Sequence, residues 1–205
     1  MKGLLTYDLV WLKGQKKLLL ILAGLSVLYL ATEGPVVLFL SVIFQMILIR
    51  TLEWNLQPAN SRFLFTLPFT RKQYVLEKYA FILLSSVALT LVLYGLGVAV
   101  HPGQLGEMTL MLVVILTELV YFTAFLVPMM IRLGASMQLW LALIVVALVA
   151  VTASLVNTLG PIMGQWVDIA GQHMGVIALC LVGLGLVCLS VSMRISGRML
   201  KKREL

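Results

Sequence analysis

The chain alternates between apolar stretches and polar segments, and its positive charge is confined to every second polar segment. The apolar stretches lie at about residues 18–32, 36–49, 80–100, 108–131, 137–157 and 174–193. All fifteen Lys and Arg residues lie on one side of them, at both chain ends, within 50–79 and at Arg132. The remaining segments carry only Glu33, Glu107 and Asp168 as charged residues. Because Lys and Arg near span ends stay in the cytoplasm, this pattern predicts an all-α polytopic membrane protein with six transmembrane helices and both termini cytoplasmic.

The composition is also that of a membrane protein. Of the 205 residues, 61% are hydrophobic and 11% are charged, whereas a soluble domain carries about 25% charged residues. Six spans leave no room for a soluble catalytic domain, so residues 1–205 are expected to form one transmembrane domain in the plasma membrane. The net charge of +7 lies next to span ends. It therefore indicates contact with anionic membrane lipids and no nucleic-acid partner.

Two segments are predicted to lie in the membrane interface. Residues 1–17 repeat leucines at helical spacing, which predicts an N-terminal amphipathic interfacial helix, with a frayed terminus as the alternative. Residues 158–173 mix glycines with apolar side chains, which favours short helices resting in the external interface. The first two spans are short against the usual ~20 residues, so a shallow re-entrant hairpin is an alternative for them. The polar side of the N-terminal helix is expected to comprise Lys2, Asp8, Lys13, Lys16 and Lys17.

The sequence contains no motif for catalysis or for nucleotide binding. A G-x-x-x-x-G-K-[ST] phosphate-binding loop is absent, so the chain is not expected to hydrolyse ATP itself. Its two histidines, His101 and His173, belong to no metal-binding or triad pattern. We therefore expect that the chain is not an enzyme and binds no metal or cofactor.

A helix start is encoded inside the basic segment 50–79. Thr70 and Gln73 form a Thr-x-x-Gln capping box, which predicts a helix that begins near Arg71 and continues into the third span. Its basic residues are then expected at the level of the lipid headgroups: Arg71, Lys72 and Lys78.

A short helix is predicted just before this start, at residues 60–67, and Pro68 would end it. Four of its side chains are too apolar to face the cytosol alone, so they either enter the bilayer or dock onto a protein. They are Phe63, Leu64, Phe65 and Leu67.

The sequence LPFTRKQYVLEKY at 67–79 resembles the LP-x-[ST]-R-[KR]-x-x-V-x-x-K segment between spans 2 and 3 of type-2 ABC-transporter permeases. The amphipathic opening, the six spans and the cytoplasmic ends are similar as well. The resemblance implies a permease domain that pairs with a second permease, as a homodimer or a heterodimer. It also implies a separate cytoplasmic ABC ATPase subunit, which would hold the ATP and Mg.

The resemblance further implies that the 50–79 loop carries a coupling helix seated in a groove of the ATPase. An alternative is that its basic residues only anchor the loop to lipid. The residues expected to form or flank the coupling helix, or to match the motif, are Asn60, Ser61, Arg62, Phe63, Phe65, Thr66, Leu67, Pro68, Thr70, Arg71, Lys72 and Lys78.

Glu118 is the acidic residue that lies deepest in a predicted span, 108–131. A carboxylate there costs about 2.5–3.5 kcal/mol on insertion scales and marks function by default. It should face protein or a polar cavity, with Thr117 and Tyr121 as local partners. We expect Glu118, Tyr121 and Gln45 to line a substrate path or a dimer interface. The alternative is a protonated residue that only packs.

Together these features predict the permease subunit of an ATP-driven exporter of an amphipathic or hydrophobic cargo, for which a peptide is one candidate. Two other functions stay open. One is a proton-coupled secondary transporter that uses Glu118, and the other is a non-transporting membrane scaffold or immunity protein.

Overall fold

The computed structural model describes residues 2–32, 34–57, 60–61, 70–134 and 174–202. The elements assigned within these ranges are all helical. In chain order they are α1 (Lys2–Gly14), α2 (Lys16–Thr32), the 3-10 helix η1 (Gly34–Phe39), α3 (Leu40–Asn55), α5 (Arg71–Val100), the 3-10 helix η2 (Pro102–Gln104), α6 (Leu105–Leu133) and α8 (Met174–Lys202).

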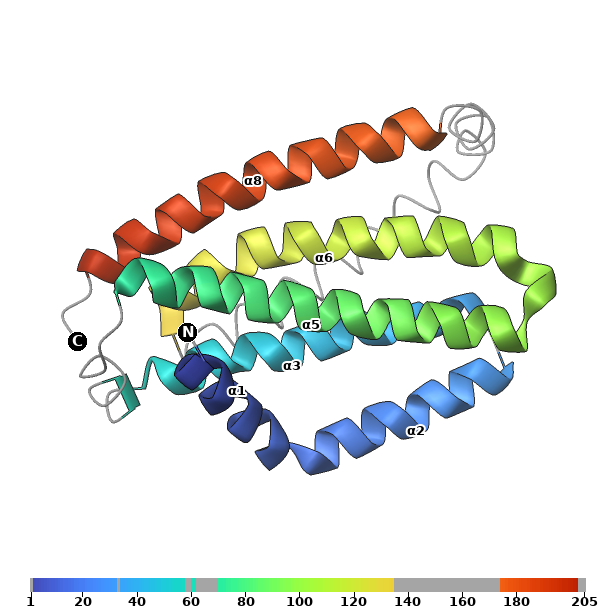
Figure 1. The fold of residues 1–205 in the computed structure, drawn as a ribbon, viewed down its shortest axis with the longest axis horizontal. Helices are drawn as coiled ribbons and strands as arrows, with labels where there is room; N and C mark the ends of the chain where they lie inside the picture. The colour runs from blue at the N-terminus through green and yellow to red at the C-terminus, as the bar shows by residue number, and fades with distance from the viewer. Residues whose placement is uncertain (1, 33, 58–59, 62–69, 135–173, 203–205) are drawn as a thin grey trace, which may run out of the picture.

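The helices α3, α5, α6 and α8 run along the length of the bundle, and α2 lies along one side of it (Figure 1). Helix α5 packs on α3 and α6, and α6 packs on α8. The axis of α1 is bent by 73° from that of α2, which lays α1 against α3 and α5. The starts of α1 and α5 and the end of α8 share one end of the bundle (Figure 1). We call it the basic end, because Lys72, Arg194 and Arg198 lie there.

The start of α5 confirms the capping box expected from the sequence. The Thr70 hydroxyl accepts a hydrogen bond from the Gln73 backbone N–H at 3.2 Å, and the Gln73 side chain accepts one from the Thr70 N–H at 2.9 Å. These bonds satisfy two backbone donors that a helix start would otherwise leave unpaired. From there α5 continues without a break for 30 residues to Val100, where Pro102 begins η2.

Two helices extend beyond the apolar stretches that predicted them. The second span was expected to end at residue 49, but α3 continues to Asn55. The last span was expected to end at residue 193, but α8 continues to Lys202. A charged residue such as Arg50 or Arg194 ends an apolar run without ending a helix, because straight-chain basic residues are good helix formers. The cytoplasmic loop expected at 50–79 therefore begins within a helix and is shorter than predicted.

Four helices in the described ranges are long and apolar enough to cross a membrane: Val37–Asn55, Arg71–Val100, Pro102–Leu133 and Cys180–Leu200. The bent pair Gly3–Gly14 and Lys16–Ala31 brings the number to five if it is one span. The chain is therefore a multi-pass helical membrane protein. The expected span at 137–157 and the expected interfacial segment at 158–173 lie outside the described residues.

The core divides into two apolar clusters along the bundle. One surrounds Leu52 and Ile82 near the basic end, and the other surrounds Leu38 and Leu119 near the opposite end. Gln45 of α3 reaches α6 in the buried interior. Its amide donates to the Leu119 carbonyl at 2.7 Å and to the Thr123 hydroxyl at 2.5 Å. A hydrogen bond of this kind fixes the register between two helices where apolar packing alone is permissive.

A glycine allows α8 to approach α6 closely. A Cβ built on Gly185 would lie 3.0 Å from a methyl carbon of Val120. Nearby, the Tyr121 hydroxyl donates to the Leu181 carbonyl at 3.1 Å, and the Ser192 hydroxyl donates to the Ala124 carbonyl. Small residues at such contacts let helix backbones pack tightly where lipid offers no hydrophobic driving force between them.

The Gly185→Ala variant should weaken this contact, because Val120 is β-branched and its side chain cannot rotate freely within a helix. Gly183 is the matched control, since a Cβ there meets no atom within 4 Å. We expect Gly185→Ala to be less stable than Gly183→Ala by about 1–3 kcal/mol, as overpacked sites are. Unfolding of the purified variants by a denaturing detergent would measure the difference. Equal stabilities would show that the α6–α8 approach is not limited by residue 185.

Candidate functional site

At the basic end, α1, the last turn of α3 and the first turns of α5 meet around one buried ion pair. The Lys78 ammonium of α5 donates hydrogen bonds to both carboxylate oxygens of Asp8 in α1. The Asn55 amide of α3 donates to the same carboxylate at 3.1 Å. Asp8 and Lys78 each have 0% of their surface exposed. Three segments that are distant in sequence are therefore joined at a single carboxylate.

Two further residues of α5, Tyr74 and Glu77, lie beside this ion pair. We call the whole group the Asp8–Lys78 cluster: Asp8, Asn55, Tyr74, Glu77 and Lys78. The Tyr74 ring lies 5.3 Å from the Lys78 nitrogen, which is within cation–π range. A carboxylate oxygen of Glu77 lies 3.9 Å from the same nitrogen. Tyr74 and Glu77 are both buried. Lys78 is thus the one cation of the cluster, and it lies beside both of its buried carboxyl groups.

Asp8 was expected on the water-facing side of the N-terminal helix, and that placement is wrong. Asp8 and Leu4 form the buried face of α1, whereas Leu5, Leu9 and Val10 are 44%, 42% and 62% exposed. The charged residue faces the protein because it finds a cation there, and the leucines face outward because the surroundings of the bundle are apolar. Lys13, Lys16 and Lys17 are exposed, as expected for the polar side of the helix. Asp8 is therefore the residue of that side that the spacing placed wrongly.

Lys78 was expected at the headgroup level with Arg71 and Lys72, and the structure separates the three. Lys78 is buried against Asp8. Arg71 is partly buried and donates to the Leu200 carbonyl of α8 at 2.7 Å. Lys72 is exposed. Only Lys72 of these three therefore presents a freely exposed charge at the start of α5.

The other expected coupling residues are placed only in part. The Asn60 amide donates to the Trp54 carbonyl at 2.9 Å, and the Ser61 N–H donates to the Gln57 carbonyl at 2.8 Å. These bonds attach residues 60 and 61 to the end of α3 and to Gln57 just after it. The remaining residues of the expected coupling helix lie outside the described ranges: Arg62, Phe63, Phe65, Thr66, Leu67 and Pro68.

The residues expected on a substrate path do not converge. Glu118 is half-buried, and it shares a stripe of α6 with Phe125, which is exposed. The hydroxyls of its expected partners are engaged elsewhere: Thr117 donates to the Val113 carbonyl at 2.8 Å and Tyr121 donates to α8. Gln45 bonds to the buried face of α6. Glu118 and Tyr121 therefore border the α8 side of α6, while Gln45 belongs to the core.

Comparison with known proteins matches almost the whole length of this bundle to one family. Residues 3–201 match a model described as an ABC-2 family transporter protein. The chain belongs to the ABC-2 transporter family. Among proteins of curated function and among solved structures, none matches the chain.

Family membership agrees with the resemblance drawn from 67–79 and with the helical spans of the described ranges. Within those ranges, no group of three or more His, Cys, Asp or Glu residues is arranged to hold a metal ion. Among the polar features of the described residues, the Asp8–Lys78 cluster joins three separate helices, α1, α3 and α5.

The contacts that Asn55 and Tyr79 make were not expected from the sequence. The Tyr79 hydroxyl lies 2.6 Å from the Ser192 hydroxyl and 2.9 Å from that of Ser196, so it joins α5 to α8. A signal was present, because Ser192 and Ser196 are four positions apart and so lie on one face of a helix. Asn55 gave no comparable signal, since it lies in a polar stretch.

Removing Lys78 should strongly destabilise the basic end. In Lys78→Met the buried Asp8 carboxylate would lose its cation, which typically costs about 3–5 kcal/mol. The double variant Asp8→Asn with Lys78→Met should recover part of that loss, because no uncompensated charge then remains. Lys72→Met, on the same helix but exposed, should change stability by no more than about 0.5 kcal/mol. Denaturing-detergent titrations would measure all three. Asp8→Asn alone, measured in the same way, completes the cycle. A double variant as unstable as the sum of Asp8→Asn and Lys78→Met would show that the charges are not coupled.

Proposed function

We propose that this ABC-2 protein is the membrane-spanning permease subunit of an ATP-driven exporter. In this proposal the chain crosses the plasma membrane six times with both termini in the cytoplasm. It pairs with a second permease, identical or related, and a separate cytoplasmic ABC ATPase subunit binds ATP and Mg. The 56–70 loop docks on that ATPase.

The proposal depends on one observation: the two helix ends that flank the 56–70 loop are both attached to the same residue of α1. The chain leaves α3 just after Asn55 and enters α5 at Arg71, and both helix ends are bonded to α1 through Asp8. Separating a buried ion pair of this kind costs about 3–5 kcal/mol. A displacement imposed on the loop would therefore move α1, the end of α3 and the start of α5 together.

Two further contacts would carry such a displacement through the bundle. Arg71 bonds to the Leu200 carbonyl, so the first turn of α5 is attached to the end of α8. Helix α5 itself is unbroken from the basic end to the opposite end, where the His101 imidazole lies 2.7 Å from the Leu30 carbonyl of α2. Movement driven by ATP at the loop thus has a continuous route to the far side of the membrane.

The cargo proposed is amphipathic or hydrophobic, and a peptide is one candidate. An apolar groove of about 450 Å³ lies between α6 and α8, lined by Tyr121, Ala124, Phe125, Pro128, Val187, Cys188, Val191, Ser192 and Ile195. Glu118 lies one turn from Tyr121 on the same helix. A surface of this kind suits apolar groups with an occasional polar contact, and offers few hydrogen-bonding groups to a sugar.

Co-purification would test the coupling role. The tagged chain should bring down a nucleotide-binding subunit and ATPase activity from mild detergent. The Arg62/Phe63/Phe65→Ala triple variant should lose both, because aromatic and Arg anchors contribute about 2 kcal/mol or more each at interfaces. A matched triple variant, Lys13/Leu9/Val10→Ala, removes one cation and two exposed apolar side chains from α1 and should retain the subunit.

Purification of the parent chain alone, without ATPase activity, would contradict the proposal. Transport that continues without any ATPase and is lost in Glu118→Gln would favour the proton-coupled alternative instead.

A further inference from the structure

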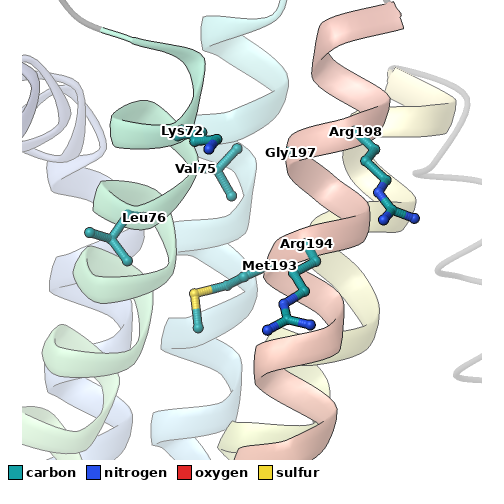
Figure 2. Close-up of a pocket in the computed structure, with 7 residues that line it drawn as sticks. All are labelled: Lys72, Val75, Leu76, Met193, Arg194, Gly197 and Arg198. Carbon is teal, nitrogen blue, oxygen red and sulfur yellow. The ribbon is translucent and has the colours of Figure 1, made fainter.

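A groove between α5 and α8 opens at the basic end, on the side of α5 away from α1. Its volume is about 430 Å³, and seven residues line it: Lys72, Val75, Leu76, Met193, Arg194, Gly197 and Arg198. Figure 2 shows Val75 of α5 and Met193 of α8 extending toward each other across the groove, with Arg194 and Arg198 carried by α8. This is within the size range of about 300–1,000 Å³ that is usual for ligand sites.

Hydrogen bonds hold the two walls of the groove together at both of its ends. Arg71 joins α5 to the Leu200 carbonyl of α8 at the end nearer the loop. Tyr79 joins α5 to Ser192 and Ser196 about two turns deeper. The lining residues lie between these two attachments. The groove is therefore a fixed feature of the α5–α8 pair.

The length of α5 places the groove at the level of the lipid headgroups. Its 30 residues span about 45 Å at 1.5 Å per residue, whereas the hydrocarbon core of a bilayer is about 30 Å thick. If the core ends where α5 ends at Val100, about the first ten residues of α5 extend beyond the hydrocarbon. Lys72 and Leu76 belong to that part.

The lining combines exposed cations with an apolar floor. Lys72, Arg194 and Arg198 are all exposed, and none of the seven lining residues is acidic. Val75 at the floor is 4% exposed, while Leu76 at the rim is 50% exposed. This pairing of a basic rim with an apolar floor matches a molecule that has an anionic head and a hydrocarbon chain.

A glycine keeps the floor open on the α8 side. A Cβ built on Gly197 meets no atom within 4 Å, so a larger side chain would fit the backbone but would fill the groove. Its neighbours one turn away on α8, Met193 and Arg194, carry long side chains. The cavity therefore exists at this position because residue 197 has no side chain.

We propose that this groove binds an anionic phospholipid of the cytoplasmic leaflet, with its phosphate between Lys72, Arg194 and Arg198 and acyl chain against Val75, Leu76 and Met193. The proposal rests on the proposed membrane orientation but not on the ATPase. A lipid fits the groove better than an acidic protein surface does. An acidic surface would contact only the cations of the rim and would leave the apolar floor without a partner.

Lipid binding to the purified full chain in detergent would test the proposal. Native mass spectrometry would count bound dioleoyl-phosphatidylglycerol against dioleoyl-phosphatidylcholine during titration. The parent should prefer phosphatidylglycerol. Arg194→Gln with Arg198→Gln should lower its affinity about fivefold per charge, or about 25-fold together. Gly197→Leu should also reduce binding, although it leaves every charge in place.

Three controls distinguish lipid binding in the groove from a general electrostatic attraction between the anionic lipid and the basic protein. Arg132→Gln removes an exposed cation at the end of α6 and should leave binding unchanged, and so should Gly183→Leu, which adds the same side chain to α8 outside the groove. Inorganic phosphate should not displace the lipid. Equal binding of the two lipids, unchanged binding in Gly197→Leu, unchanged binding in Arg194→Gln/Arg198→Gln, or displacement by phosphate would each overturn the proposal. None of these results depends on whether an ATPase co-purifies with the parent.

Discussion

The arrangement of the basic end depends on the ion pair between Asp8 and Lys78. Both charges are withdrawn from solvent, and a buried charge is tolerated only where its partner is present. Helix α1 therefore cannot leave α5 without breaking this ion pair and leaving the Asp8 carboxylate without its cation. Asn55 adds the end of α3 to the same carboxylate. The end of α3, the first turns of α5 and α1 are all joined at this one carboxylate.

The first turns of α5 make contacts on two different faces. One face carries Tyr74, Glu77 and Lys78 toward α1, and the other carries Lys72 and Val75 toward α8. A displacement of the loop and a lipid bound in the α5–α8 groove would therefore both act on the first turns of α5. A lipid in that groove and an ATPase at the loop would be energetically linked through the position of α5, since the loop leads directly into α5 and the groove is lined by its first turns.

Local signals in the sequence predicted the helices well. The Thr70–Gln73 capping box fixed the start of α5, because both of its hydrogen bonds close within four residues. Apolar runs located the spans of the described ranges. The predictions of helix ends were less accurate, as α3 and α8 show. The end of an apolar run indicates the edge of the membrane and does not indicate the last helical residue. Of the expected site residues, Lys78 was identified by its motif but its burial was not anticipated.

The sequence by itself determined that this chain is a helical membrane protein of the ABC-2 type, since hydropathy, charge sidedness and capping are properties of neighbouring residues. Only the tertiary structure decided which cation Asp8 meets, because the two residues are 70 positions apart and several other cations would have suited a carboxylate equally well. It also decided that α1 turns Asp8 inward and Leu5 and Leu9 outward. The groove beside Gly197 likewise exists only where two distant helices are held side by side.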